Sequence, residues 1–202
     1  SCHDNGFKRS AGVTRGNGGI MSKQPATADN ARDLALRVRE FIDSSVVPNE
    51  HRLDARGHGI SDDVRADLQT AARQHAVFAP TAPRDLGGLG LNHIEQAVVL
   101  EEAGRSLLGP SALNCAAPDE GNMLLLDKVA TPAQRERYLR PLATGAVRSS
   151  FAMTEPAPGA GADPDSLLTT ARQVGDGWVI TGNKWYTTGA DGAAFSIVMA
   201  RT

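Results

Sequence analysis

The stretch Ser-Ser-Phe-Ala-Met-Thr-Glu-Pro, residues 149–156, lies where the character of the chain changes. Before it, apolar residues recur every three or four positions, which is the spacing of one face of a helix. After it come short runs rich in Thr, Val, Ile and aromatic residues, and such runs favour strands. The stretch therefore divides a helical unit from a β unit, and the expected fold class is α+β.

Five helices are expected before this point, because start or stop signals flank the apolar repeats. Ser61 has the position of an N-cap residue, Asn92 and Glu95 have the spacing of a capping box, and Thr131 is followed by a proline suited to a first helical turn. The expected helices cover residues 31–47, 61–75, 92–108, 123–129 and 131–140, with stops at Pro48, at Gly109-Pro110 and before Pro141.

The β unit is expected to begin a barrel-like domain without completing it. Strands are expected over residues 149–154, 167–174, 178–181, 184–188 and 194–200, with Asp176-Gly177 as a hairpin turn. The last strand would leave an open edge, so we expect a fragment of a longer protein that is inactive alone and associates through its sheet. The expected divisions are a disordered tail over residues 1–28, a helical domain over residues 29–147 and a partial β domain over residues 148–202.

Composition narrows the class of protein. Of the 202 residues, 41% are hydrophobic and 22% charged, which is typical of a globular chain. The formal net charge of -2 disfavours nucleic acid as a partner, and no apolar run is long enough to cross a bilayer. The two cysteines, Cys2 and Cys115, are far apart in sequence, so a reducing, cytoplasmic location is expected. The histidines and cysteines lack zinc-ligand spacing, so no metal is expected.

Several stretches, in the order helices then strands, carry a resemblance to a known family. The segment 151–156, followed by Gly-Ala-Gly-Ala-Asp at 159–163, resembles the flavin-binding signature of the acyl-CoA dehydrogenases. Residues 82–91, 101–105 and 182–188 are similar to three further segments of that family. Residues 114–123 resemble the branch that acts on long, branched or hydroxylated acyl chains.

The resemblance implies FAD as cofactor and an acyl-CoA thioester as substrate. Such enzymes remove an α-proton with a glutamate base while the β-hydrogen leaves as hydride to the flavin. That glutamate belongs to a C-terminal domain, so no catalytic residue is expected in this chain, and Glu155, before a loop at the sheet rim, is not the base. The implied cofactor-binding residues are Phe151, Ala152, Met153, Thr154, Trp185, Tyr186 and Thr187.

Within this set the resemblance implies different roles. Main-chain donors and the Thr154 hydroxyl would face the pyrimidine end of the ring, Trp185 would pack near the ring, and Thr187 would donate to its reactive nitrogen. Met153, Thr154 and Thr187 are then expected around one hollow. Trp185 and Tyr186 fall on opposite faces of the expected strand, where a core role is equally open. Strand propensity alone would make Thr187 an ordinary strand residue.

One loop departs from the family pattern. Gly161 and Ala162 are the implied substrate-binding residues, but Ala162 stands where relatives have a serine that contacts the thioester. Ala157 and Pro158 are also inserted ahead of this loop. The substrate contact through this loop is therefore expected to differ.

Three functions are open from the sequence. The first is an FAD-dependent acyl-CoA dehydrogenase of the fatty-acid β-oxidation type, passing electrons to electron-transfer flavoprotein and forming a homo-oligomer. The second is an acyl-CoA oxidase or flavin monooxygenase on the same scaffold. The third is a non-catalytic interaction module that keeps only the helical domain.

Overall fold

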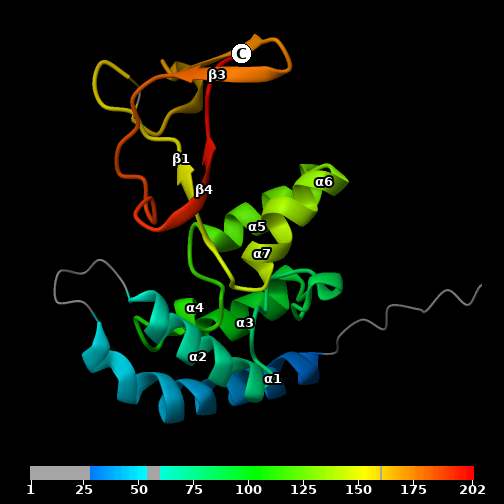
Figure 1. Cartoon of the computed structure of the whole chain (residues 1–202). Coiled ribbons are helices and arrows are strands. Elements are labelled where there is room, and N and C mark those ends of the chain that lie inside the picture. The colour runs from blue at the N-terminus through cyan, green and yellow to red at the C-terminus, as the bar shows by residue number, and fades with distance from the viewer. Residues whose placement is uncertain (1–27, 54–59, 160) are drawn as a thin grey trace, which may run out of the picture.

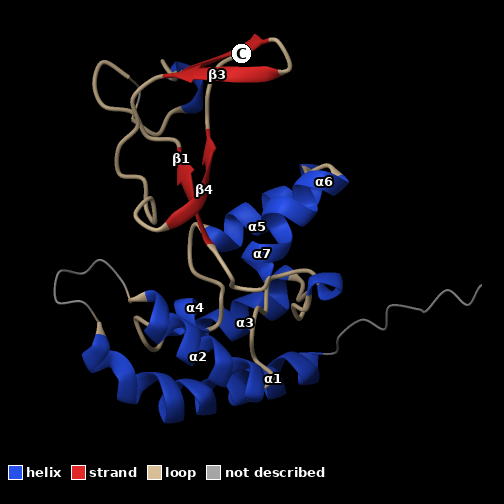
Figure 2. Ribbon diagram, viewed as in Figure 1, coloured by secondary structure: helices blue, strands red, loops and turns tan. Residues whose placement is uncertain are grey.

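The computed structural model of the chain describes residues 28–53, 60–159 and 161–202. The helices lie together, and the strands rise from one side of them (Figure 1; Figure 2). The expected α+β class is confirmed: a helical N-terminal part is followed by a few strands, and no closed barrel occurs among the described residues. The tail expected over residues 1–28 lies outside the described residues, except that Ala28 begins the first helix.

The helical part is built from seven named α-helices in the described ranges. Short π and 3-10 turns extend or connect some of them. None of the described helices is long and apolar enough to cross a membrane. The α-helices are α1 (Ala28–Phe41), α2 (Asp62–Gln74), α3 (His93–Ala103), α4 (Gly109–Ala112), α5 (Asp119–Val129), α6 (Pro132–Gln134) and α7 (Arg140–Ala143).

The capping signals in the sequence mark the starts of helices correctly. The Asn92 side chain accepts from the backbone of α3, and the Asn92 N–H donates to the Glu95 carboxylate at 2.8 Å. Thr131 and Gln134 form the same reciprocal pair at the start of α6. Ser61 is the N-cap residue of α2, although its side chain makes no capping bond there.

The two helix stops predicted at prolines are wrong. Pro48 lies inside a continuous helical run that passes from α1 through a π turn to Arg52, and Pro141 lies inside α7. In both places the residue before the proline donates its N–H to the carbonyl five positions earlier, Val47 to Ile42 and Arg140 to Arg135. This wider turn accommodates a ring that would otherwise clash with the carbonyl four positions back.

Apolar side chains from most of these helices form the core of the helical part. The apolar faces of α1 and α2 meet the segments around α4, α5 and α7, which buries one continuous cluster. On the solvent side of α1, the Arg39 guanidinium donates two hydrogen bonds to the Glu102 carboxylate of α3, at 2.5 and 2.9 Å. The largest fully buried side chains of the cluster include Phe41, Ile42, Leu108, Leu113, Met123, Leu139 and Leu142.

The third helix ends earlier than predicted. α3 stops at Ala103, and Gly109-Pro110 begins α4 instead of ending α3. A side-chain carbon at Gly109 would overlap the carbonyl oxygen of Ala103, so glycine is what lets α4 pass this close to the end of α3.

Replacing Gly109 with Ala is therefore expected to lower the free energy of unfolding by about 1–3 kcal/mol, because backbone must shift to admit the methyl group. Gly121→Ala is the matched control: Gly121 lies in α5 with open space around it, so the same change is expected to stabilise the helix by about 0.5–1 kcal/mol. Denaturant titration of both variants measures the difference. Equal effects at the two positions would contradict the close approach.

The strands form two separate pairs. β1 (Arg148–Ala152) lies parallel to β4 (Ala193–Val198), with Phe151 opposite Ile197. β2 (Thr170–Val174) and β3 (Gly177–Thr181) form an antiparallel hairpin. Every residue of β3 is exposed, including Trp178, which is 56% exposed.

The hairpin is confirmed, but its turn is shifted by one residue. Gly177 pairs with Val174 in the last rung, so the two turn residues are Gly175 and Asp176. Gly175 has φ +59°, and a two-residue loop with glycine first is a favoured hairpin connection. The expected strand over residues 184–188 is absent from the described structure.

Candidate functional site

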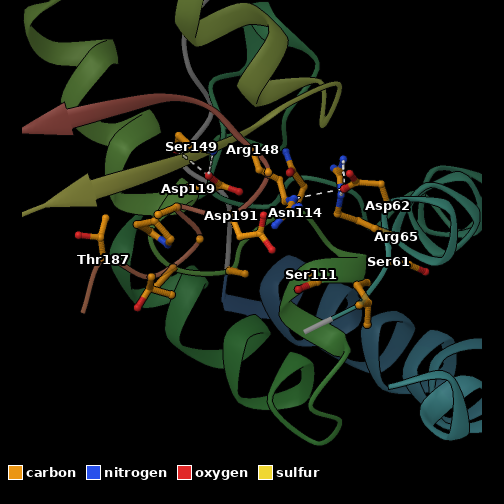
Figure 3. Close-up of a pocket in the computed structure, with 18 of the residues that line it drawn as sticks. Ser61, Asp62, Arg65, Ser111, Asn114, Asp119, Arg148, Ser149, Thr187 and Asp191 are labelled. Atoms are coloured by element: carbon orange, nitrogen blue, oxygen red, sulfur yellow. Dashed lines mark hydrogen bonds and ion pairs between the residues drawn. The ribbon is translucent and has the colours of Figure 1, made fainter. Parts of the chain in front are cut away.

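A cavity of about 1250 Å³ opens between the helical part and the loop that leads into β4 (Figure 3). Three separated stretches of chain line it. The first runs from Ile60 to Gln69, the second from Ser111 to Asp119, and the third from Tyr186 to Gly192. Arg52, and Arg148 and Ser149 at the start of β1, complete the wall.

Asn114 is a buried polar residue that fixes the second stretch. Its side-chain nitrogen donates to the carbonyls of Leu142 and Ala143, each at 3.1 Å. These carbonyls lie at the end of α7, where that of Leu142 also accepts from the Gly145 N–H at 3.0 Å. Asn114 itself has φ +55°, a conformation that asparagine tolerates better than most residues. The helix end and the cavity wall are thereby joined at one side chain.

Asp119 links α5 to β1 beside the cavity. Its Oδ1 accepts from the backbone N–H of Ser149 at 2.7 Å and from the Ser149 hydroxyl at 2.6 Å. Asn122 donates to the same hydroxyl at 2.9 Å. Burial raises the pKa of Asp119, and the two bonds from Ser149 oppose that shift. The carboxylate is thus half-desolvated and held by one of its two oxygens.

Arginines and aspartates alternate along another side of the cavity. Asp62 lies between Arg65 and Arg148, at 3.3 and 3.2 Å (Figure 3). Arg65 also donates to the carbonyl of Gly145 at 2.7 Å, in the link between the helices and β1. The two arginines thus share one carboxylate, and these contacts connect α2 to the start of the sheet.

The residues implied to bind flavin fall into two groups. Phe151 and Ala152 lie in β1, and Met153 and Thr154 continue from its end. Tyr186 and Thr187 line the cavity, whereas Met153 and Thr154 do not. This cavity is therefore not a hollow shared by Met153, Thr154 and Thr187, and that expectation stays a prediction. The two groups are nevertheless adjacent, because the Trp185 N–H donates to the Thr154 carbonyl at 3.1 Å.

The predicted strand over residues 184–188 is instead an irregular segment. Tyr186 has φ +51°, a left-handed conformation that breaks the alternation of a strand. This turn brings the rings of Trp185 and Tyr186 to the same side, with centroids 4.7 Å apart. The expectation that the two rings occupy opposite faces is wrong for that reason. Both side chains are exposed, at 44% and 79%.

Backbone donors at these two places suit a flavin. Among the described residues, the N–H groups of Thr154 and Thr187 donate to no acceptor. The carbonyl and nitrogen acceptors on the edge of an isoalloxazine ring need donors of this kind, aimed from fixed backbone. The exposed rings of Trp185 and Tyr186 offer the apolar contact that such a ring also needs. The residues present therefore fit the cofactor that the resemblance implies.

Glu155 holds these two groups together. Its carboxylate is 3% exposed and accepts from the backbone of Leu168 and Thr169 at 2.6 and 2.9 Å, and from Lys184 at 2.9 Å. Lys184 also donates to the Met153 carbonyl at 2.8 Å. Through these bonds, side chains connect the end of β1 to the segment after β3, where a regular sheet would have backbone hydrogen bonds. Both carboxylate oxygens of Glu155 are engaged in this way, and that Glu155 is not the base stays a prediction.

Bonds from Thr169, Leu168 and Lys184 lower the pKa of Glu155 from 4.5 to about 2. A carboxyl whose pKa is lower in the folded state contributes stability above its unfolded pKa, and this contribution disappears as the pH falls through the folded value. We therefore expect Glu155→Gln to be clearly less stable than the wild type at about pH 7, with the gap narrowing between pH 4.5 and about 2. Denaturant titrations across this range measure the gap. A gap independent of pH would contradict the assigned pKa.

The implied substrate loop folds back on Glu155. Gly161 has φ +62° and its carbonyl accepts from the Glu155 N–H at 3.0 Å. Ala162 follows it and is exposed. Neither residue belongs to the wall of the cavity. Their role in binding substrate stays a prediction.

Sequence reasoning did not identify the polar groups of the cavity. Arg65 and Arg148 belong to no motif, and each reaches the cavity through packing between distant segments. Asn114 and Asp119 lie in the segment 114–123, whose resemblance to the family assigned no role to either residue. A polar residue in an otherwise apolar segment can indicate a functional site. The sequence does not show which of these polar residues lie close together in the fold.

Comparison with known proteins places both parts of the chain in one family. Residues 28–146 match the acyl-CoA dehydrogenase N-terminal domain, and residues 150–202 match the middle domain. The "Probable acyl-CoA dehydrogenase FadE2" of Mycobacterium tuberculosis is 37% identical over 88% of this chain and 45% of its own length. Acyl-CoA dehydrogenase family member 10 of Mus musculus is 34% identical, over 85% of this chain and 17% of its own length.

Solved structures agree. A Mycobacterium abscessus protein assigned as an acyl-CoA dehydrogenase matches with a TM-score of 0.73 and 36% identity, over 85% of this chain and 46% of that one. An acyl-CoA dehydrogenase from Bacillus anthracis complexed with FAD matches with a TM-score of 0.65 and 25% identity, over 86% of this chain and 29% of that one. The chain thus spans less than half the length of these relatives. With its helical domain and the first strands of its middle domain both matched, the chain belongs to the acyl-CoA dehydrogenase family.

Proposed function

We propose that this chain forms the helical domain and the first part of the middle domain of an FAD-dependent acyl-CoA dehydrogenase. The complete enzyme would catalyse α,β-dehydrogenation of an acyl-CoA thioester, of the kind used in fatty-acid β-oxidation. The observation that carries the proposal is the bond from the Trp185 N–H to the Thr154 carbonyl, 3.1 Å long. It sets the two segments implied to contact the flavin side by side, with free backbone donors in each.

The residues of the chain would have distinct tasks. Thr154 and its neighbours in β1 would hold the pyrimidine edge of the flavin, Trp185 would pack against the ring, and Thr187 would donate to the reactive nitrogen. Bound FAD would supply the two-electron chemistry of the reaction. Glu155 and Lys184 would position these groups without touching the reacting atoms. The glutamate that removes the α-proton would come from polypeptide outside this sequence.

The proposed partners follow from the same reaction. Acyl-CoA would be the substrate, and electron-transfer flavoprotein would reoxidise the enzyme. We further propose a homo-oligomer, which is the assembly that the family resemblance implies.

Reduction of bound flavin tests the proposal. The complete enzyme that contains this chain should purify with FAD, and its visible absorbance should bleach when an acyl-CoA is added without oxygen. A protein that cannot take up FAD, or a flavin that no acyl-CoA reduces, would refute the assignment.

A second candidate is an oxidase or monooxygenase on the same scaffold. It is favoured by Ala162, which lacks the serine hydroxyl typical of the dehydrogenases at that place. Oxygen uptake during turnover separates the two reactions. Stoichiometric peroxide, or an oxygenated product, would favour the second candidate over the first.

A further inference from the structure

A buried polar network joins the helical part to β1, the strand that leads into the segment proposed to hold the flavin. Asp119 and Asn122 of α5 bond to Ser149 and Ser150 at the start of β1. Asn122, Ser149 and Ser150 are each at most 2% exposed. The network is therefore already enclosed by the chain itself and needs no further polypeptide to cover it.

The two residues of α5 act together on β1. They are three positions apart and lie on the same face of the helix. Asp119 Oδ1 accepts from the Ser149 N–H at 2.7 Å and from the Ser149 hydroxyl at 2.6 Å (Figure 3). Asn122 Nδ2 donates to the Ser149 hydroxyl at 2.9 Å and to the Ser150 carbonyl at 3.2 Å. Two consecutive residues of β1 are thus bonded to α5, through backbone and side chain alike.

β1 has few backbone bonds of its own at this point. Among the described residues it pairs with one strand, β4, and the register of that pair shifts between Arg148 and Ser149. The Ser150 hydroxyl bonds to the Ser196 hydroxyl of β4, so the polar network crosses the pair. An isolated two-stranded pair is only marginally stable. The bonds from α5 therefore supply constraints on β1 that a larger sheet would supply through backbone.

Hydrogen bonds fix this contact more narrowly than apolar packing would. Apolar contacts are not directional, so they leave a helix free to shift along a strand. A slip of β1 by one residue, about 3.3 Å, would move Ser149 away from α5 and turn every side chain of the strand to the opposite face. The polar groups of Asp119 and Asn122 would then be buried without their partners, which is costly.

On the basis of the proposed function, we propose that Asp119, Asn122 and Ser149 are positioning residues for the flavin. They hold β1 at one place relative to the helical part, so that residues 151–154 present their donors at fixed points on the ring. None of the three touches the reacting atoms. Their effect on the reaction is nevertheless large, because a misplacement of about 1 Å that originates far from the chemistry can slow a reaction by about 100-fold.

Ser149→Ala in the complete flavin-loaded enzyme tests this role, and Ser106→Ala is the matched control. Ser106 is 2% exposed, and its hydroxyl donates to Glu50 at 2.7 Å and accepts from the Leu108 N–H at 3.2 Å. The two substitutions remove the same kinds of bond from equally buried sites. Ser106, however, lies in the link between α3 and α4 and not beside β1.

Anaerobic stopped-flow reduction by a saturated straight-chain acyl-CoA, over a range of concentrations, gives the limiting rate and the apparent dissociation constant of the substrate. Ser149→Ala should lower the limiting rate by about 10- to 100-fold and change the dissociation constant by less than about 3-fold, because a displaced flavin affects the reaction more than substrate binding. Ser106→Ala should keep the limiting rate within about 3-fold of the wild type. Denaturant titration should show that both variants are folded, with similar losses in the midpoint.

Two variants of Asp119 test the bonds independently of Ser149→Ala. Asp119→Asn keeps a side-chain oxygen that can accept both bonds from Ser149, so the limiting rate should stay within about 10-fold of the wild type. Asp119→Leu has a similar size and no acceptor, and it should slow reduction as much as Ser149→Ala does. The difference between the two variants measures the hydrogen bonds apart from the size of the side chain.

The outcomes separate this role from the proposed function. Equal limiting rates in Ser149→Ala and Ser106→Ala would overturn the positioning role, and so would equal rates in Asp119→Asn and Asp119→Leu. A wild type that binds FAD but is reduced by no acyl-CoA would refute the proposed reaction alone. In that case fluorescence titration of the apoprotein with FAD decides the positioning role, since Ser149→Ala should bind FAD more weakly than Ser106→Ala, and equal affinities would overturn it.

Discussion

Replacing Lys184 with Met is expected to lower the free energy of unfolding by about 3–5 kcal/mol, the usual cost of removing one partner from a buried ion pair. The Lys184 side chain is 11% exposed and its partner Glu155 is 3% exposed. The substitution would leave the Glu155 carboxylate buried without its cation and would free the Met153 carbonyl as well. Methionine has a similar length and apolar stem, so the change removes mainly the charge.

Lys128→Met is the matched control, because Lys128 is exposed at the end of α5. Denaturant titration should show a change within about 0.5 kcal/mol for this variant. The double variant Glu155→Gln/Lys184→Met should recover part of the loss, since no unpaired charge then stays buried. Equal stability of Lys184→Met and Lys128→Met would disprove that the Glu155–Lys184 ion pair stabilises the fold.

Replacing Thr187 with Val in the complete enzyme is expected to slow flavin reduction by about 100- to 1000-fold. Valine keeps the shape of threonine but removes the hydroxyl, so a donor aimed at the reactive nitrogen would be lost. Loss of one aimed donor has an effect of this size in oxyanion sites. Stopped-flow absorbance under anaerobic conditions measures the reduction rate.

The neighbouring Thr188→Val separates this role from a general effect of polarity. Thr187 and Thr188 both line the cavity, but only Thr187 is assigned to the flavin. We expect Thr188→Val to change the rate by less than about 10-fold, since it removes no assigned donor. Equal slowing in both variants, or normal reduction in Thr187→Val, would refute the assignment of Thr187.

The helical part could be predicted well wherever a signal and its effect lie within a few residues. The capping boxes at Asn92 and Thr131 work because the donor and acceptor are three positions apart. The stops at Pro48 and Pro141 failed because a π turn, stabilised by the buried residues on either side, outweighs the local preference of proline.

The β part shows the same limit. The run over residues 184–188 has strand propensity, yet its backbone bonds to the segment after β1 at one point, from Trp185 to Thr154. Lys184 bonds to that segment through its side chain instead. No local pattern contains the 29-residue separation between Glu155 and Lys184. A positive φ at Tyr186 then places its ring beside Trp185.

By itself, the sequence determined the division into helices and strands, the hairpin, and the segments that resemble a flavin site, because each depends on neighbouring residues. Only the tertiary structure decided that Asp119, Ser149 and Thr187 border one polar cavity, and that Glu155 and Lys184 form a buried ion pair. The physical reason is that such sites arise where segments far apart in the chain pack together, and packing depends on the whole set of buried contacts.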